Sequence, residues 1–484
     1  MSNQSNMAAF LARGAAKAPA NAPNAPGGGA GGGKSDDRKK YDRAVEQMAD
    51  EPEEAIAAFA ALLADTRDDA ALQKLKENAI FKLCELYGRL QRAQALVELL
   101  KGVRPFFKDI AKAKTAKIVR TVINEVARCD GADELQFQLC EEYVGWCKQE
   151  KRTFLRQRIQ SKLAQLHLAH HHYQPALKLL RELESEIKRL DDKMMLVEIF
   201  LTQSRVHHAL RNVPRARSAL TAARANANSI YVGPLLQAEL DLQGGVLNAE
   251  DGDYRTGYSY LFEAFEGLTN LADPRALLAL KYMLLCKTMD GKLEDIEHIL
   301  ASKLALKIST RYNAPTSPRS GANKPDSPRK ETLRRATKAG LGWSHILAMK
   351  AVAGAYRKRS LHELDEVLAQ YTRELGGDTT VKAHLKTLET QLLEQNLQRI
   401  IEPYSCVEIA HVAARIALAE DKVEQKLSQM ILDKKLHGTL DQGAGTLVLF
   451  EDADADKTYG EAVACITNMG EVVESLFSRA KGLS

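Results

Sequence analysis

Three short stretches of the sequence contain residue types that could hold a phosphate group or a metal ion. The first, Gly28 to Ser35, satisfies the phosphate-binding pattern G-x-x-x-x-G-K-S letter for letter. A working loop of this kind joins a buried strand to a helix whose backbone amides bind the phosphate. Here Ala-Pro-Asn repeats precede the loop and cannot form such a strand. We therefore interpret it as a glycine-rich linker and expect no cofactor.

Histidines form the second candidate group, because two imidazoles on one helix face can bind a metal ion. His170, His171 and His172 follow His167 by about one helical turn. No Glu or Asp follows them at the spacing found in zinc proteases. They also fall at an expected turn just before Tyr173, so we predict a solvated polar turn rather than a metal site.

The third candidate is an acidic run that begins like a calcium-binding loop, with Asp452, Asp454 and Asp456 at alternate positions. Lys457 stands where such a loop needs glycine, and Val463 stands where it needs a bidentate glutamate. Negative charge is favourable at the start of a helix, so we expect this run to cap one. Since no stretch supplies catalytic, metal-binding or cofactor-binding residues, we expect a protein without enzymatic activity.

Composition points to elements that are almost entirely helical. The 484 residues are rich in Ala, Leu, Glu, Lys, Gln and Arg, and aromatic residues make up only 6%. No apolar run approaches the about 18 residues needed to cross a bilayer, and no signal peptide is evident. The seven cysteines form no C-x-x-C pair. We expect an all-α chain, with reduced thiols, that resides in the cytoplasm and nucleus without a membrane partner.

The net charge of +5 is concentrated in one segment. Residues 311–338 contain eight Lys/Arg and two Asp/Glu, so the rest of the chain is close to neutral. A neutral body argues against nucleic acid as a partner. The same segment contains several Pro and Ser residues, and Ser317 and Ser327, each followed by proline, are possible phosphorylation sites. We predict a disordered basic insertion here.

A repeated pattern predicts helix pairs in the first part of the chain. Several predicted helices begin with an apolar or aromatic residue three positions before a small one, as in Tyr173 with Ala176 and Tyr254 with Gly257. The fourth positions fall at 93, 135, 176, 216 and 257, at intervals of 42, 41, 40 and 41 residues. A small residue where helices cross lets their backbones approach. The period predicts a right-handed, TPR-like helical-repeat solenoid.

The period changes near the C-terminal end, where two short helices and two strands are predicted. They span Val407–Leu418, Lys422–Lys434, Leu436–Leu440 and Thr446–Phe450. This order is that of a winged helix, a fold that often binds DNA. The second helix carries a net charge near +1 and a full apolar face, which favours protein contact over nucleic acid. We predict an interface at Leu436, Leu447 and Leu449.

One long helix is predicted from Asp456 to Lys481. Its apolar residues are spaced four and three apart if Gly470 is included, as in a helix that joins a bundle. The predicted interface residues of this helix are Tyr459, Val463, Ile466, Val473 and Phe477.

These segments divide the chain into six parts. They are a disordered tail (1–37), the solenoid (38–310), the insertion (311–340), further helices (341–403), the winged helix (404–452) and the C-terminal helix (453–484).

The order of solenoid, winged helix and long C-terminal helix resembles that of the PCI-domain family, whose members build the proteasome lid, the signalosome and a translation-initiation scaffold. Particular motifs resemble those of a proteasome-lid member. They are Leu393-Glu-Gln-Asn-Leu397, Arg399-Ile-Ile-Glu-Pro403, Lys426 to Lys435, His437-Gly438, Leu440-Asp-Gln442, Asp456-Lys-Thr-Tyr459 and, upstream, Lys281 to Lys287 and Lys303 to Leu306.

The resemblance implies a structural role in ubiquitin-dependent degradation. It assigns residues 341–403 to the helical part of the PCI domain. In this family the PCI module joins other PCI lid subunits edge to edge, and the C-terminal helix enters a helical bundle. The solenoid contacts the ATPase ring and a core α-subunit. The alternative is a PCI scaffold in a translation-initiation or signalosome complex.

Overall fold

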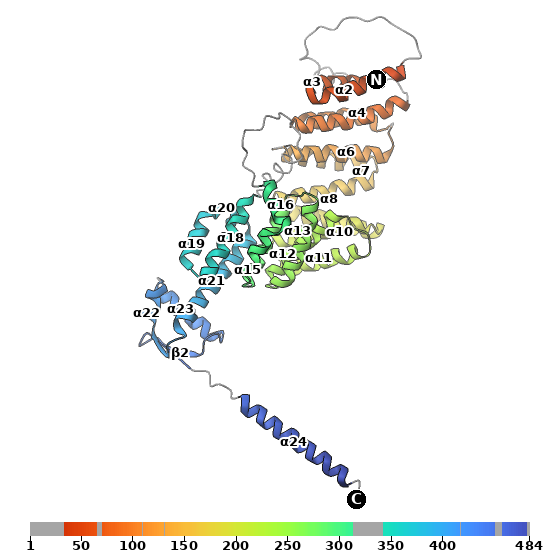
Figure 1. Ribbon diagram of the computed structural model, residues 1–484. Coiled ribbons are helices and arrows are strands. Elements are labelled where there is room, and N and C mark those ends of the chain that lie inside the picture. Colours follow the sequence, from red (N-terminus) through yellow and green to blue (C-terminus); the bar gives the residue numbers. More distant parts are fainter. Residues whose placement is uncertain are drawn as a thin grey trace. The chain divides into compact units, whose positions relative to one another are not determined.

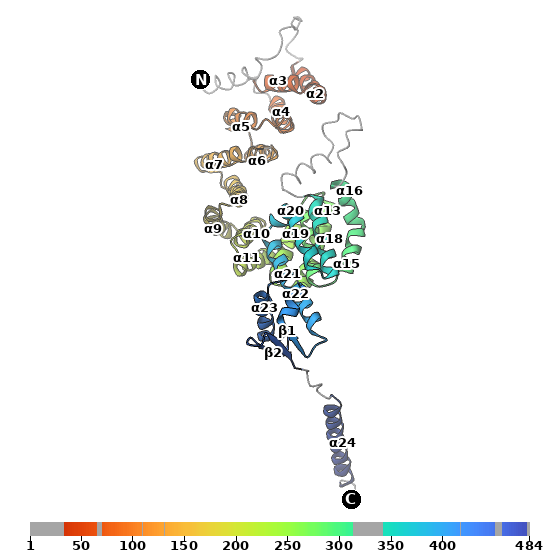
Figure 2. The ribbon, with the colours of Figure 1, turned by 90° about the vertical axis from the view of Figure 1, so that its left-hand side faces the viewer.

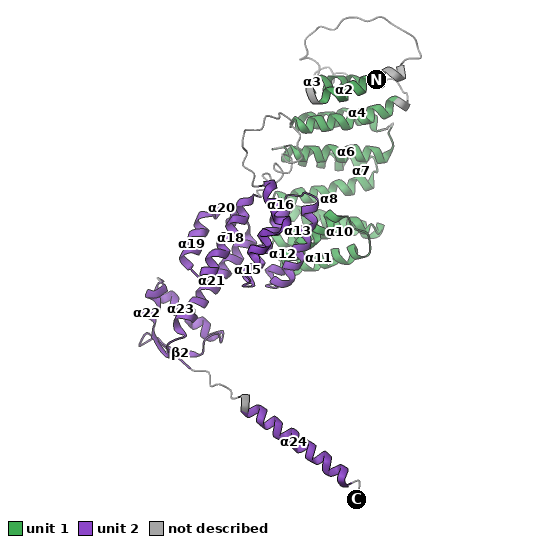
Figure 3. Cartoon of the chain, viewed as in Figure 1, with its two compact units in different colours: residues 1–247 green, residues 248–484 purple. Residues whose placement is uncertain are grey.

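The computed structural model describes residues 33–64, 70–108, 110–129, 131–312, 342–416, 418–450 and 457–481. These residues are helical apart from their connections and one small sheet near the C-terminal end (Figure 1), which confirms the all-α prediction. In these ranges no helix has both the length and the apolar character needed to cross a bilayer. The chain divides into two compact units, residues 1–247 and 248–484 (Figure 3).

The first unit is a stack of helices in chain order, each packed mainly against its neighbours in sequence (Figure 2). The helices are α2 (Gly33–Asp50), α3 (Pro52–Ala64), α4 (Ala70–Arg89), α5 (Ala93–Gly102), the 3-10 helix η1 (Arg104–Lys108), α6 (Lys112–Arg128), α7 (Asp133–Gln149), α8 (Thr153–Ala169), α9 (Tyr173–Leu190), α10 (Lys193–Ala209), α11 (Val213–Asn228) and α12 (Pro234–Glu250), whose last residues belong to the second unit. The sequence analysis assigned residues 1–37 to a disordered tail. Because α2 begins at Gly33, residues 33–37 belong to a helix instead.

The predicted helix-pair period is present in the structure. Helices α5, α7, α9, α11 and α13 (Tyr254–Asn270) begin at residues 93, 133, 173, 213 and 254, at intervals of 40, 40, 40 and 41. Stacked pairs of this kind bury a continuous core. Within the first unit, one core cluster runs from Ala44 to Leu163 and a second from Ala164 to Leu247.

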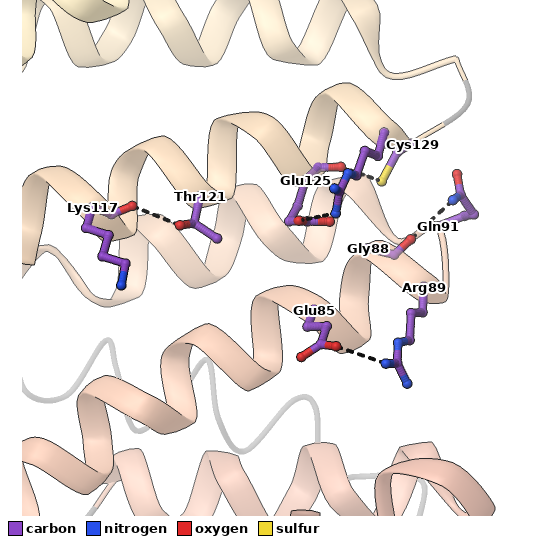
Figure 4. Close-up of polar contacts among 9 residues, drawn as sticks. Glu85, Gly88, Arg89, Gln91, Lys117, Thr121, Glu125 and Cys129 are labelled. Atoms are coloured by element: carbon purple, nitrogen blue, oxygen red, sulfur yellow. Dashed lines mark hydrogen bonds and ion pairs between the residues drawn. The ribbon is translucent and has the colours of Figure 1, made fainter. Parts of the chain in front are cut away.

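The turns that separate successive pairs share one backbone geometry. A residue with positive φ recurs at Gln91, Gly131, His171, Arg211, Gly252 and Gly291. After several of these residues, the next N–H donates to a carbonyl five residues back, as His172 does to His167 at 2.8 Å. This is the Schellman ending of a helix. At the first turn, the Gln91 side chain also donates to the carbonyl of Gly88 (Figure 4).

The prediction of a small residue where helices cross is met in α9, α11 and α13 but not in α5 and α7. Ala176, Ala216 and Gly257 are buried fourth residues of their helices. In α5 and α7 the buried fourth residues are Leu96 and Gln136, so the predicted positions 93 and 135 were wrong. The reason is that these two helices begin three residues and one residue later than the pattern assumed.

In the early array, Gly88 near the end of α4 lies against the flexible side chain of Glu125. A Cβ atom at this glycine would lie 2.7 Å from Oε2 of Glu125 on α6. Figure 4 shows polar contacts in α4 and α6: Arg89 pairs with Glu85 near the end of α4, and Thr121 donates to the Lys117 carbonyl within α6.

The second unit continues with more helices and then a winged helix. The helices are α13, α14 (Ala276–Met289), α15 (Glu294–Ala301), α16 (Lys303–Tyr312), α18 (Trp343–Lys358), α19 (Leu361–Gln370), α20 (Thr372–Gly376) and α21 (Thr379–Ile401). Arg311 and Tyr312, assigned to the insertion by sequence, belong to α16. The rest of that insertion, with Ser317 and Ser327, lies outside the described residues.

The winged helix has one more strand than the sequence predicted. It consists of β1 (Cys406–Glu408), α22 (Ile409–Ile416), α23 (Glu420–Leu432), β2 (Gly438–Asp441) and β3 (Thr446–Leu449). All pairing is antiparallel in the order β1-β3-β2, and Val407 lies opposite Leu447. The prediction that a helix starts at Val407 was therefore wrong, because pairing with β3 holds this apolar residue in a strand. Beyond it lies α24 (Lys457–Lys481).

Candidate assembly interface

The five predicted interface residues of the C-terminal helix lie exposed on α24. Tyr459, Val463, Ile466, Val473 and Phe477 have between 60% and 76% of their surface accessible. We call these residues the first stripe. Because a helix advances 100° per residue, spacings of four and three keep them on one face.

Sequence reasoning missed a second apolar stripe on the same helix. Cys465, Met469, Val472 and Leu476, which we call the second stripe, are also exposed and are spaced four, three and four apart. Most of its members precede a first-stripe residue by one position, so the two stripes lie about 100° apart. Together they make roughly half of the circumference of α24 apolar. The polar residues Glu461, Asn468, Glu471 and Ser475 lie on the remaining arc.

The winged-helix residues predicted as an interface lie mainly in the core. Leu436 and Leu447 are buried in a cluster with Leu427 and Met430, and Leu449 is half-buried against it. Strand side chains alternate between faces, and the prediction chose the inward-facing half of β3. Val448 is exposed between the two leucines of the strand, so it, rather than Leu447, is available to a partner.

Three consecutive polar residues of the Leu393–Leu397 motif fasten α21 to its surroundings. The Glu394 carboxylate lies 2.8 Å from Lys426 Nζ and 2.7 Å from Lys435 Nζ, both in the winged helix. Burial opposes ionisation of Glu394, but hydrogen bonds and the charges of both lysines outweigh it and lower the pKa. Gln395 donates to Tyr356, and Asn396 donates to the Arg359 carbonyl.

The upstream motif residues Lys281 and Tyr282 attach α14 to the next helices of the second unit. Lys281 donates to the carbonyl of Glu374 at 3.1 Å, and Tyr282 donates to Asp378 at 2.7 Å. Both side chains are almost fully buried. Burial raises the pKa of Tyr282, which keeps its hydroxyl protonated and able to donate to Asp378, whereas burial lowers the pKa of Lys281.

Gly438 accounts for the His437-Gly438 motif. A Cβ atom at this position would lie 2.5 Å from the backbone oxygen of Val448 on the adjacent strand. A side chain would therefore separate β2 from β3. The motif residues described above thus maintain the packing of the second unit.

The candidate chemical sites from the sequence do not form one centre. His167 is buried, with its ring edge-on to Phe137 at 4.7 Å, whereas His170, His171 and His172 are exposed. His171 Nδ1 lies 2.9 Å from the Tyr173 hydroxyl. Among the described residues, no group of three His, Cys, Asp or Glu could hold a metal ion. Residues 28–32 of the glycine-rich match and the acidic run 452–456 lie outside those residues.

Comparison with known proteins agrees with this architecture. Residues 37–170 match the family model described as the 26S proteasome regulatory subunit RPN6 N-terminal domain, and residues 368–451 match the PCI domain. The 26S proteasome non-ATPase regulatory subunit 11 homolog of Arabidopsis thaliana is 48% identical over 427 residues, covering 88% of this chain and 94% of the relative. The chain belongs to the RPN6 family.

Fungal members of the RPN6 family match over a slightly smaller share of each chain. The probable 26S proteasome regulatory subunit rpn6 of Schizosaccharomyces pombe is 41% identical, covering 84% of this chain and 89% of the relative. The 26S proteasome regulatory subunit RPN6 of Saccharomyces cerevisiae is 39% identical, with coverage of 84% and 88%. In the RPN6-family chain described here, the PCI match ends before α24 begins, so the two-striped helix lies beyond that module.

Proposed function

We propose that this chain is a non-catalytic structural subunit of the 26S proteasome lid, present in the cytoplasm and nucleus. In this role it holds lid, ATPase base and core particle together for ubiquitin-dependent degradation. Membership of a family whose relatives are named as 26S proteasome regulatory subunits supports this role. The observation that carries it in the molecule itself is the exposed double stripe of α24.

A helix that is apolar over half its circumference has to pack against other helices. A two-stranded coiled coil covers one stripe only. Two stripes about 100° apart fit a helix with two different neighbours, as in a bundle of three or more helices. The proposed neighbours of α24 are the C-terminal helices of other PCI lid subunits.

The winged helix offers a second attachment. With the strand order β1-β3-β2, both β1 and β2 are sheet edges, and an edge strand can pair with a strand from another chain. We assign edge-to-edge contact with neighbouring PCI subunits to this sheet. Contacts of the solenoid with the ATPase ring and a core α-subunit belong to the same proposal and rest on family membership.

The test is a truncation that ends the chain at Asp456 and removes α24. We expect the truncated protein to fold but no longer to co-migrate with the regulatory particle on a native gel. Its matched control is a chain that lacks residues 1–32, which should co-migrate as the full chain does. Co-migration of the α24 truncation at the full-chain level would refute the bundle role.

A further inference from the structure

The first unit has a row of exposed apolar side chains that neither the winged helix nor α24 accounts for. Of the six large apolar residues that are exposed in its described part, five occur at only three turns. These five residues, which we call the apolar edge, are Phe154, Leu190, Met194, Tyr231 and Leu235. The sixth, Leu210, follows α10 at a turn of the other kind.

The three turns are equivalent positions of the helical repeat. They connect α7 to α8, α9 to α10 and α11 to α12. Phe154, Met194 and Leu235 are each the second residue of the helix that follows the turn. Helices α8 and α10 pack directly together, and Arg205 on α10 pairs with Glu239 on α12 at 3.0 Å. The apolar residues therefore follow one side of this stack.

The two aromatic side chains of the apolar edge, Tyr231 and Phe154, are its most exposed members. Tyr231 is 88% exposed and Phe154 is 69% exposed, so neither ring stabilises the core of the unit. The connection that carries Tyr231 also departs from the neighbouring turns, because it has no residue with positive φ. An aromatic side chain held out on a fixed scaffold is typical of a binding surface.

Charge and spacing together define the chemistry of the partner. Residues 150–154 carry a net charge of +1 and residues 190–194 a net charge of −1, so the two turns sum to zero, and residues 226–235 carry no charge. A phosphate-rich ligand or an anionic membrane would require an excess of Lys and Arg. Helices in contact lie about 8–10 Å apart, and a helix repeats its heptad positions about every 10 Å. Because α8 and α10 are in contact, a helix lying along the edge meets their two turns about one heptad apart.

We infer that the apolar edge binds an amphipathic helix of a neighbouring subunit, with apolar residues at heptad spacing and few charges beside them. This inference rests on the proposed function, because that function supplies the assembly in which such a neighbour exists. It concerns a surface separate from α24 and from the sheet of the winged helix.

The test places a photo-crosslinking amino acid at position 231 of the full chain within the purified regulatory particle. The expected crosslink joins it to one helical segment of another subunit, at an apolar residue of a heptad pattern. Failure to crosslink in an assembled particle, or crosslinks only to this chain, to a second copy of it, to lipid or to a non-helical segment, would overturn the inference. Failure of the chain to assemble at all would count against the proposed function instead.

A substitution series checks that the edge itself forms the contact. With the crosslinker at position 235, F154S combined with Y231S should reduce the yield at least tenfold. The matched control, L210S, changes an exposed leucine outside the apolar edge and should leave the yield unchanged. Thermal melting of each purified chain verifies folding. Should the double variant not fold, Y231S alone, at a position 88% exposed, serves in its place, and an undiminished yield refutes the inference.

Discussion

Lys151 occupies the left-handed region of backbone space, with φ of 52°, at the turn between α7 and α8. For residues other than glycine this conformation costs about 1 kcal/mol. This cost is offset because the turn provides hydrogen bonds to the last carbonyls of α7: the Arg152 N–H donates to the Cys147 carbonyl at 2.9 Å. The left-handed residue of this turn was not predicted from the sequence, since a lysine occupies a position at which pattern reasoning expects glycine.

Substituting K151G should therefore stabilise the first unit by roughly 0.5–1 kcal/mol. The measurement is a urea unfolding curve of the full chain. The same substitution at Lys178, in the middle of α9 and exposed, should destabilise it by about 1 kcal/mol, because glycine weakens a helix interior. Equal effects of the two substitutions would contradict the role of the left-handed turn.

His167 should make stability depend on pH. Its pKa is lowered from the ordinary 6.5, chiefly by burial and then by His172, against the opposing charge of Glu141. The unfolded chain therefore takes up a proton on this residue before the folded chain does. The free energy of unfolding falls as the pH drops from about 6.5 through the lowered pKa, and H167Q should weaken this dependence. The comparison is urea unfolding at pH 7.5 and 5.5, with the exposed His298, which is not among the charges acting on His167, changed to Gln as the matched control.

At the scale of elements, α24 shows what spacing could predict and what it could not. The first stripe was predicted correctly as a face of one helix, but whether it would be buried or exposed depends on neighbours that the sequence of one chain does not contain. The second stripe was not part of the prediction, which followed a single line of spacings along the helix. Similarly, the apolar run of β3 predicted a strand but not which of its alternating faces enters the core.

If α24 packs against two different helices, each of the two stripes is required for assembly. M469S combined with L476S should reduce incorporation into the regulatory particle at least tenfold, as should I466S combined with V473S. The matched control is E471S combined with N468S on the polar arc, which should incorporate normally. Competition between tagged variant and untagged full chain measures the ratio. Normal incorporation of the second-stripe variant would show that α24 contacts a single partner helix.

At the scale of the whole molecule, the period of the repeat and the order of its modules were readable from the sequence, whereas the contacts that join modules were not. Glu394 and Lys426 stand 32 positions apart, and no local pattern relates them. Only the resemblance marked these residues, and the structure explains them as a clamp between α21 and the winged helix.

E394A should loosen that clamp. Removing the carboxylate leaves Lys426, whose side chain is only 13% exposed, without its partner. A largely buried pair that loses one member destabilises by about 1–3 kcal/mol. Limited proteolysis of the full chain should then cut faster between α21 and β1. E389A, at an exposed position on the same helix, should be cleaved at the same rate as the unchanged chain. Equal cleavage rates for E394A and E389A would show that Glu394 does not hold α21 against the winged helix.

The exposed stripes of α24 also distinguish an assembled copy of the chain from a surplus one. Eight large apolar side chains on this helix are open to solvent in the single chain. A copy that finds its partners hides them, whereas a copy made in excess keeps displaying them. In the assembly proposed above, the exposure of these side chains on α24 therefore distinguishes an unassembled copy of the chain from an assembled one.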